Sequence, residues 1–119
     1  MCNQVAVACT YCMLAEMVTL ARRSGITAER LPEALEGGFG DSGLLQARGP
    51  SMIAGDFTPV GEIATMLKDL DILDRVAAEA NTALPMTALA TQLFRLIDAK
   101  GHGHLDITAI VKLFENGDG

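Results

Sequence analysis

The sequence has no tryptophan, one tyrosine and four phenylalanines in 119 residues. Hydrophobic residues still make up 50% of the chain, and leucine, alanine, methionine and valine carry most of this content. Such side chains suit packed helices better than sheets, whose strands are enriched in aromatic and β-branched residues. The ample apolar surface argues against intrinsic disorder, and the length suits one domain.

Basic residues are also few, with nine lysines and arginines against fifteen acidic residues and a net charge of −6. This balance excludes a general nucleic-acid binder or a binder of anionic membranes, because phosphate binding requires a basic surface. The three cysteines, Cys2, Cys9 and Cys12, are odd in number and lie in one segment. They predict no disulfide framework, so we expect a cytoplasmic protein.

The sequence offers no convincing membrane span. Residues 5–21 come closest, but Glu16 lies inside this run, and Thr10 and Thr19 interrupt it. A charge at the centre of a bilayer costs about 2.5–3.5 kcal/mol. No basic residue precedes the run, as a signal peptide requires. We therefore expect a long buried helix that needs cover on most sides, and no membrane partner.

Helical spacing dominates, and no alternating pattern predicts a strand. We predict an all-α domain of about six helices over residues 1–115, with a frayed tail at 116–119. The expected helices span residues 2–23, 28–35, a short turn through 44–48, 61–81, 85–100 and 107–115. A further single turn is expected at 51–54.

Glycine, proline and short polar residues set the expected boundaries. Gly25 ends the first helix, and Asp41 or Ser42 caps the third. Gly49-Pro50 is expected to break that third helix, because proline lacks an N–H. Asp106 is expected to cap the last helix, which turns Ile110 and Leu113 inward. The helix over 85–100 has an apolar stripe of Leu89, Leu93 and Leu96.

Three motifs resemble calcium, zinc or redox sites, but their residues or their positions do not suit that chemistry. Residues 98–106 imitate a calcium loop, yet Lys100, His102 and Ala109 stand where oxygen ligands belong. His102 and His104 lack a third zinc ligand nearby in sequence. Cys9 and Cys12 have CxxC spacing but fall inside an apolar helix, which favours buried structural thiols. We therefore predict no metal site. There is also no P-loop and no complete GxGxxG, so no dinucleotide fold is expected within this chain.

The polar pairs Asn3-Gln4 and Lys68-Asp69 are not explained by the core, although a solvated helix surface would account for either. They belong to an ordered set of motifs that covers residues 2–114. The set continues through Leu35-Glu-Gly-Gly-Phe39 with Ser42, Gly49-Pro-Ser-Met52, Asp56-Phe-Thr-Pro59, Lys68-Asp-Leu70, Leu84-Pro85 and Gly103-His-Leu-Asp106. This set resembles the C-terminal helical domain of the β-hydroxyacid dehydrogenases, which is similar to that of 6-phosphogluconate dehydrogenase. The family includes 3-hydroxyisobutyrate dehydrogenase and tartronate semialdehyde reductase (2-hydroxy-3-oxopropionate reductase), and the Asn-Gln form is nearer to the latter.

The resemblance implies roles for specific residues. In the family's Lys-x-x-Asn-(Asn/Gln) pattern, the catalytic lysine stands immediately before the position of Met1, and Asn3 and Gln4 bind substrate. Lys68 is implied to contact the cofactor, and Asp69 to support that helix. The cofactor is NAD or NADP in the full-length parent, and none is expected on this chain alone. Without the lysine and the N-terminal Rossmann domain, its expected partner, the chain is expected to be inactive.

One departure from the family pattern bears on substrate choice. The family often has Pro-Gly-Phe before the Lys68 helix, where this chain has Pro59-Val60-Gly61. Two other functions stay open. A stand-alone homodimerisation or interaction domain would use the apolar first helix, and we expect a homodimer in either case. A calcium-binding helical protein would instead melt at a calcium-dependent temperature.

Overall fold

The computed structural model describes residues 1–115, and its regular structure there is helical apart from one isolated bridge between Glu62 and Asp106. The predicted all-α class is therefore confirmed. The frayed tail predicted at 116–119 lies outside the described residues. The elements are α1 (Cys2–Arg23), the 3-10 helix η1 (Ala28–Arg30), α2 (Leu31–Leu35), α3 (Gly43–Ala54), α4 (Ile63–Glu79), α5 (Pro85–Ile97), the π-helical turn η2 (Asp98–His102) and the 3-10 helix η3 (Ile107–Leu113).

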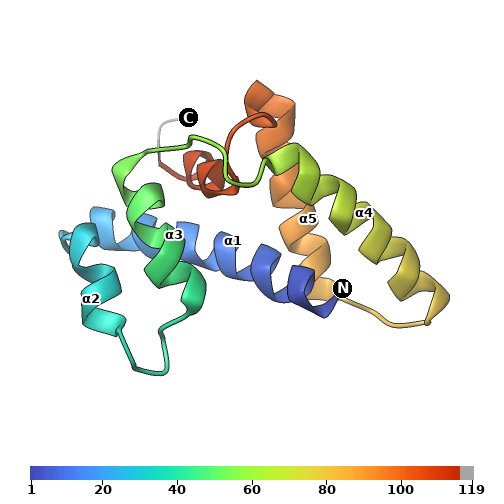
Figure 1. Ribbon diagram of the computed structural model, residues 1–119, viewed down its shortest axis with the longest axis horizontal. Coiled ribbons are helices and arrows are strands. Elements are labelled where there is room, and N and C mark those ends of the chain that lie inside the picture. The colour runs from blue at the N-terminus through green and yellow to red at the C-terminus, as the bar shows by residue number, and fades with distance from the viewer. Residues whose placement is uncertain (116–119) are drawn as a thin grey trace.

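Helix α1 runs through the middle of the molecule (Figure 1), with α2 and α3 beside one end and α4 and α5 beside the other. It packs against η3, α5 and α3. One side of the helix is buried, as the largest of its side chains show: Tyr11, Leu14 and Val18. Met13 and Leu20 remain exposed on its other sides. By length and composition α1 is apolar enough to cross a membrane, and 39% of its most apolar window is buried within the protein.

Several predicted helix ends are confirmed. Gly25 has φ of 77° just after α1, in the left-handed region that favours glycine. The Ser42 hydroxyl accepts a hydrogen bond from the Leu45 N–H and caps α3. The Asp106 carboxylate accepts one from the Thr108 N–H and caps η3. That last helix differs from expectation in being a 3-10 helix that ends at Leu113, a half-buried residue.

The predicted break at Gly49-Pro50 is wrong, because α3 continues through both residues to Ala54. Two features explain the difference. The proline ring normally clashes with the Cβ of the preceding residue, and Gly49 has none. The buried side chains Leu45, Met52 and Ile53 lie on both sides of the proline, so their burial offsets the missing hydrogen bond. Gly49 is itself buried, with Leu45 and Pro32 close to it.

Helix α5 does not use its apolar stripe as the core-facing side. Its buried residues are Thr87, Ala90, Thr91, Phe94 and Ile97. Leu89 is 64% exposed and Leu96 53% exposed, whereas Leu93 is half-buried. The α-helix also ends at Ile97, where η2 takes over, rather than at Lys100. The periodicity therefore located the helix but not the side that packs inward.

A single buried carboxylate joins three parts of the fold. Asp106 is 1% exposed and accepts five hydrogen bonds. The backbone N–H groups of Val60 and Gly61 donate to Oδ1 at 2.8 and 3.2 Å. Arg48 of α3 donates to Oδ2 at 3.0 Å, as do the N–H and hydroxyl of Thr108 at 3.0 and 2.7 Å. Asp106 therefore ties α3 and η3 to the segment that leads into α4.

Backbone hydrogen bonds complete the same junction. The first N–H groups of a helix have no partner within the helix. At the start of α4, Ile63 donates to the Leu105 carbonyl at 3.0 Å and Ala64 to the Gly103 carbonyl at 2.9 Å. Phe57 accepts a hydrogen bond from the Asp106 N–H at 3.0 Å. These contacts fix where α4 begins and in which direction it leaves the core.

We predict that Asp106→Asn lowers the free energy of unfolding by about 2–4 kcal/mol, because the amide cannot accept every bond and leaves Arg48 without its counter-charge. Urea denaturation monitored by circular dichroism measures the change. Asp74→Asn, at an exposed position of α4, is the matched control and should shift stability by less than about 0.5 kcal/mol.

The comparison of the wild type with Asp106→Asn also has a predicted pH signature. Burial raises the pKa of Asp106, but the hydrogen bonds outweigh it and lower the pKa from 3.8 to about 2. Because the pKa of Asp106 is lower in the folded than in the unfolded protein, its carboxylate stabilises the fold at pH values above 3.8. This stabilisation is lost as the pH falls through about 2. Wild-type protein should lose about 2 kcal/mol over this window through Asp106 alone. Asp106→Asn should lack that component, and equal pH slopes for the two proteins would refute this account.

Candidate functional site

A hydrogen bond between α1 and α4 brings together two of the polar residues singled out in the sequence. Nε2 of Gln4 donates to Oδ2 of Asp69 at 2.7 Å. Both side chains are half-buried. A carboxylate only accepts, so Asp69 must face the nitrogen of the Gln4 amide. The bond therefore fixes which way that amide points.

Asn3 extends this contact into a short relay. Its Nδ2 donates to Oε1 of Gln4 at 3.0 Å, so the order of donation is Asn3 to Gln4 to Asp69. Asn3 is exposed, and its carbonyl oxygen and second N–H are not used in the relay. The first turn of α1 thus presents a fixed amide acceptor and donor to a ligand.

The relay borders an open cavity of about 290 Å³ where α1 meets α4. Met1, Gln4, Asp69, Ile72 and Leu73 line it. Gln4 and Asp69 supply its polar wall, and the other three residues supply its apolar wall. An apolar cavity with a few fixed polar groups is the usual form of a small-molecule site.

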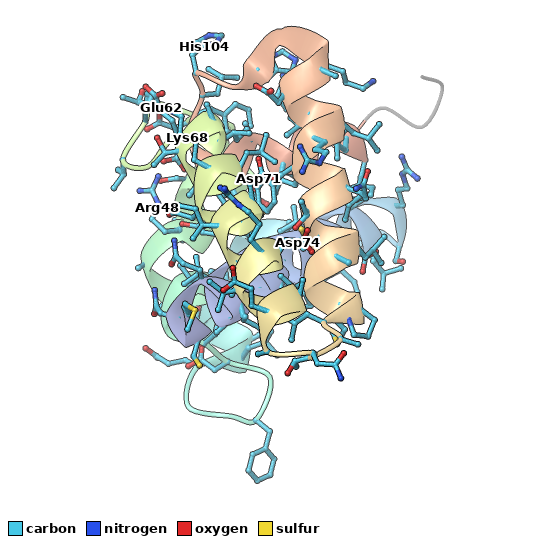
Figure 2. All side chains as sticks on the ribbon, turned by 90° about the vertical axis from the view of Figure 1, so that its right-hand side faces the viewer. Arg48, Glu62, Lys68, Asp71, Asp74 and His104 are labelled. Atoms are coloured by element: carbon cyan, nitrogen blue, oxygen red, sulfur yellow. The ribbon has the colours of Figure 1, made fainter. Side chains whose placement is uncertain are left out.

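Lys68 lies on the exposed surface of α4, one residue before Asp69 of the cavity wall. It stands one turn before Ile72, and residues four apart on a helix are neighbours. Figure 2 shows Lys68, Asp71 and Asp74 following one another along α4. Within residues 1–115, no carboxylate forms an ion pair with Lys68, whereas Asp71 pairs with Arg95. The ammonium is therefore available to an anionic ligand.

This arrangement suits binding and orientation of a small polar acid. Amide groups hold a hydroxyl or carboxylate in a fixed direction, and a nearby ammonium attracts a phosphate or carboxylate. The described residues of the cavity wall include no histidine, cysteine or lysine that could transfer a proton near neutral pH. The geometry supports positioning of a ligand.

The other motifs lie apart from this cavity. His102 and His104 belong to the connection after α5, where His104 is exposed and His102 half-buried. Among the described residues no group of three histidine, cysteine or acidic side chains could hold a metal ion. Cys9 and Cys12 are free and lie in the middle of α1. Burial raises the pKa of Cys12 to about 12, which disfavours the reactive thiolate.

Sequence reasoning missed the apolar half of the cavity. Met1, Ile72 and Leu73 line it, and none was singled out. Ile72 offered a signal, because it is a large apolar residue among Asp71, Asp74 and Arg75 on the polar side of α4, and it is 52% exposed. An isolated exposed isoleucine is too common to single out without its neighbours.

Comparison with known proteins finds one protein family over almost the whole chain. A family described as NAD-binding of NADP-dependent 3-hydroxyisobutyrate dehydrogenase matches residues 1–114. A 2-hydroxy-3-oxopropionate reductase of Escherichia coli is 34% identical over 113 residues, which are 95% of this chain and 39% of the reductase. An L-threonate dehydrogenase of Cupriavidus necator is 30% identical over 112 residues, which are 94% of this chain and 38% of the dehydrogenase.

The fold is similar to that of a solved dehydrogenase. A crystal structure of 3-hydroxyisobutyrate dehydrogenase from Salmonella typhimurium matches with a TM-score of 0.88 and 26% identity, over 94% of this chain and 39% of that one. The chain thus spans about two fifths of the length of these proteins. What their names say they act on concerns those longer proteins.

We predict that alkylation distinguishes Cys2 from Cys12. Cys2 is exposed and should react readily with iodoacetamide at pH 8, whereas Cys12 is buried, with a pKa of about 12. Cys12 should therefore stay unmodified in the native protein and react after denaturation, as measured by peptide mass spectrometry. Labelling of Cys12 at the rate of Cys2 would contradict its assignment as a packing residue.

We also predict that Gln4 and Asp69 are energetically coupled. A double-mutant cycle with Gln4→Ala and Asp69→Ala should give an interaction energy of about 0.5–1.5 kcal/mol. This is the usual net contribution of an intramolecular hydrogen bond, and solvent at the half-buried site screens the additional contribution of the Asp69 charge. Urea denaturation of the four proteins measures it. A control cycle that combines Gln92→Ala with Asp69→Ala should give no coupling, because Gln92 is at an exposed position of α5. An additive Gln4–Asp69 cycle would refute the bond.

Proposed function

Because this chain belongs to the 3-hydroxyisobutyrate dehydrogenase NAD-binding family, we propose that it is the substrate-side helical domain of an NAD(P)-dependent dehydrogenase or reductase. Its substrate is a small β-hydroxyacid or the corresponding semialdehyde, a class to which the names of its relatives point. The observation that carries the proposal is the Asn3–Gln4–Asp69 relay beside a cavity, with the exposed Lys68 preceding Asp69 on α4.

The cavity residues fit a substrate of this class. Asn3 and Gln4 hold its hydroxyl or carboxylate, and Asp69 keeps the Gln4 amide in one orientation. The apolar wall of Met1, Ile72 and Leu73 contacts its carbon chain. These residues orient the reacting carbon and exclude water from one side of it, which is the part of catalysis that positioning supplies.

Lys68 fits a negatively charged cofactor. It is exposed beside the cavity on a chain of net charge −6, so it supplies local positive charge where few basic residues are present. A bound nicotinamide cofactor supplies or accepts the hydride. Lys68 holds the cofactor against the helical domain, and we assign it no role in proton transfer.

The remaining parts of the reaction belong to residues outside the described helices. Within residues 1–115 there is no parallel sheet with a dinucleotide-binding loop. We propose that a Rossmann domain precedes this domain in a cytoplasmic parent protein. A lysine immediately before the position of Met1 would lie three and four residues from Asn3 and Gln4, on the same helix surface. That lysine is the proposed proton donor.

The direct test compares this chain with a fusion that adds a dinucleotide-binding domain ending in lysine before Met1. The chain alone should show no turnover of small hydroxyacids or semialdehydes with either cofactor, whereas the fusion should be active. Spectrophotometry of NAD(P)H at 340 nm, the absorbance band of the reduced cofactor, measures both. Turnover by the chain alone would refute the proposed division of roles.

Variants of the active fusion test the individual residues. Lys68→Ala should raise KM for the cofactor about ten-fold and Lys68→Arg much less, because the lost contact is one charge-assisted hydrogen bond. Asn3→Ala should lower kcat/KM for the substrate and leave the cofactor KM unchanged. Lys100→Ala, at an exposed position in η2, is the control and should change neither. Normal kinetics for Lys68→Ala would remove Lys68 from the site.

A further inference from the structure

A groove between α1 and α5 brings together four sulfur-containing side chains. The groove measures about 200 Å³, and Cys9, Cys12 and Met13 of α1 line it together with Met86 of α5. We call these four residues the sulfur cluster. The chain has only three cysteines, and two of them lie in this groove. The cavity assigned to the substrate uses none of the four residues, so their chemistry has to be considered separately.

Helix geometry and packing together form the sulfur cluster. Residues three and four apart on a helix are neighbours, so Cys9, Cys12 and Met13 lie on one side of α1. This side packs against α5, where Sγ of Cys9 lies 3.9 Å from Oγ1 of Thr87, the residue after Met86. Burial raises the pKa of Cys12, and the neighbouring Cys9 adds to the effect, which indicates that the two thiols are close. Packing therefore adds a thioether from a distant part of the chain to a pair of thiols.

The four side chains differ in their access to solvent. Cys12 is 8% exposed and Cys9 is half-buried, whereas Met13 is 42% exposed and Met86 75% exposed. The thiols thus lie deeper in the groove, and the thioethers lie at its mouth. Glu16, one turn after Cys12, is exposed and is the charged residue among those that line the groove. Its negative charge favours a cation, which can pass the thioethers to reach the thiols.

The ligand types indicate which cation suits the sulfur cluster. Thiolate and thioether sulfur are soft ligands, and together they favour Cu(I), whereas calcium and magnesium prefer oxygen. Zinc takes a tetrahedral set of cysteine, histidine or acidic ligands. Within residues 1–115, no third side chain of these kinds joins the two thiols to complete such a set. The sequence-based prediction of no metal site concerned calcium and zinc, and a soft monovalent ion that binds methionine is a separate case.

We propose that the sulfur cluster binds a Cu(I) ion, with the thiolates of Cys9 and Cys12 and the thioether of Met86 as its ligands. Each thiol releases its proton to solvent as an S–Cu bond replaces the S–H bond, and the copper keeps its oxidation state. In the metal-free protein Cys12 is a protonated packing residue. The ion joins α1 to α5 at a place that shares no residue with the cavity lined by Gln4 and Asp69. The proposal therefore stands apart from the proposed enzymatic activity.

Anaerobic titration of the chain with Cu(I), against bicinchoninate as a competing chelator, tests the proposal. The wild-type chain should bind a single equivalent, with release of protons and an ultraviolet band of thiolate-to-copper charge transfer. Cys9→Ser should weaken binding about a hundred-fold or more, because a hydroxyl is not a soft ligand. Met86→Leu should weaken it about ten-fold, because the thioether is lost but the shape is nearly kept. Since Met86 is 75% exposed, this variant should keep the circular dichroism spectrum of the wild type.

Two matched controls remove a sulfur atom elsewhere on α1. Cys2→Ser removes an exposed thiol and Met17→Leu a half-buried thioether, and neither residue lines the groove. Both variants should bind Cu(I) like the wild type. Loss of binding in Cys2→Ser would show capture by an exposed thiol and overturn the proposal. It would also be overturned by a wild-type chain that takes no Cu(I) from bicinchoninate, or by unchanged affinity in folded Cys9→Ser or in Met86→Leu.

Discussion

The buried carboxylate of Asp106 is the constraint on which the rest of the structure depends. Removing a charge from water is costly unless hydrogen bonds replace the lost hydration. Asp106 accepts five such bonds, from α3, from η3 and from the segment that leads into α4. These elements are distant in sequence, and each must take its native place before the charge is compensated. The carboxylate therefore favours one arrangement of helices over other apolar packings.

This junction determines where the candidate site lies. Helix α4 begins at Ile63, with its first N–H groups bonded to carbonyls of residues 103 and 105. A helix is stiff, so its start and direction also place Lys68 and Asp69, which lie about one and a half turns further along. Asp69 then meets Gln4 at the first turn of α1. The relay beside the cavity thus depends on a junction that contributes no residue to the cavity wall.

Much of this fold could be predicted from the sequence, because helix periodicity and caps are local. Cys2–Arg23 was located to the residue. Side-chain chemistry predicted the cap at Asp106 and narrowed the cap of α3 to Asp41 or Ser42, of which the structure uses Ser42. The effect of Pro50 on α3 was predicted wrongly. Gly49 has no Cβ to clash with the proline ring, and burial of Met52 stabilises the helix, but rules based on local sequence consider neither effect. Asn3, Gln4 and Asp69 were singled out as candidate site residues in two separate pairs, and the bond that joins Gln4 to Asp69 was not predicted, because it depends on the crossing of α1 and α4. Only packing fixes that crossing.

The exposed apolar side of α5 shows what apolar periodicity means in a small domain. The spacing of Leu89, Leu93 and Leu96 indicates an apolar side of the helix. It does not indicate which element packs against that side. Within one copy Phe94 and Ile97 already fill the position against the core, because both are fully buried while the leucines beside them are not. Because α5 has more apolar side chains than the core of one copy can bury, some of them lie on the molecular surface. That exposed apolar surface shares no residue with the cavity lined by Gln4 and Asp69.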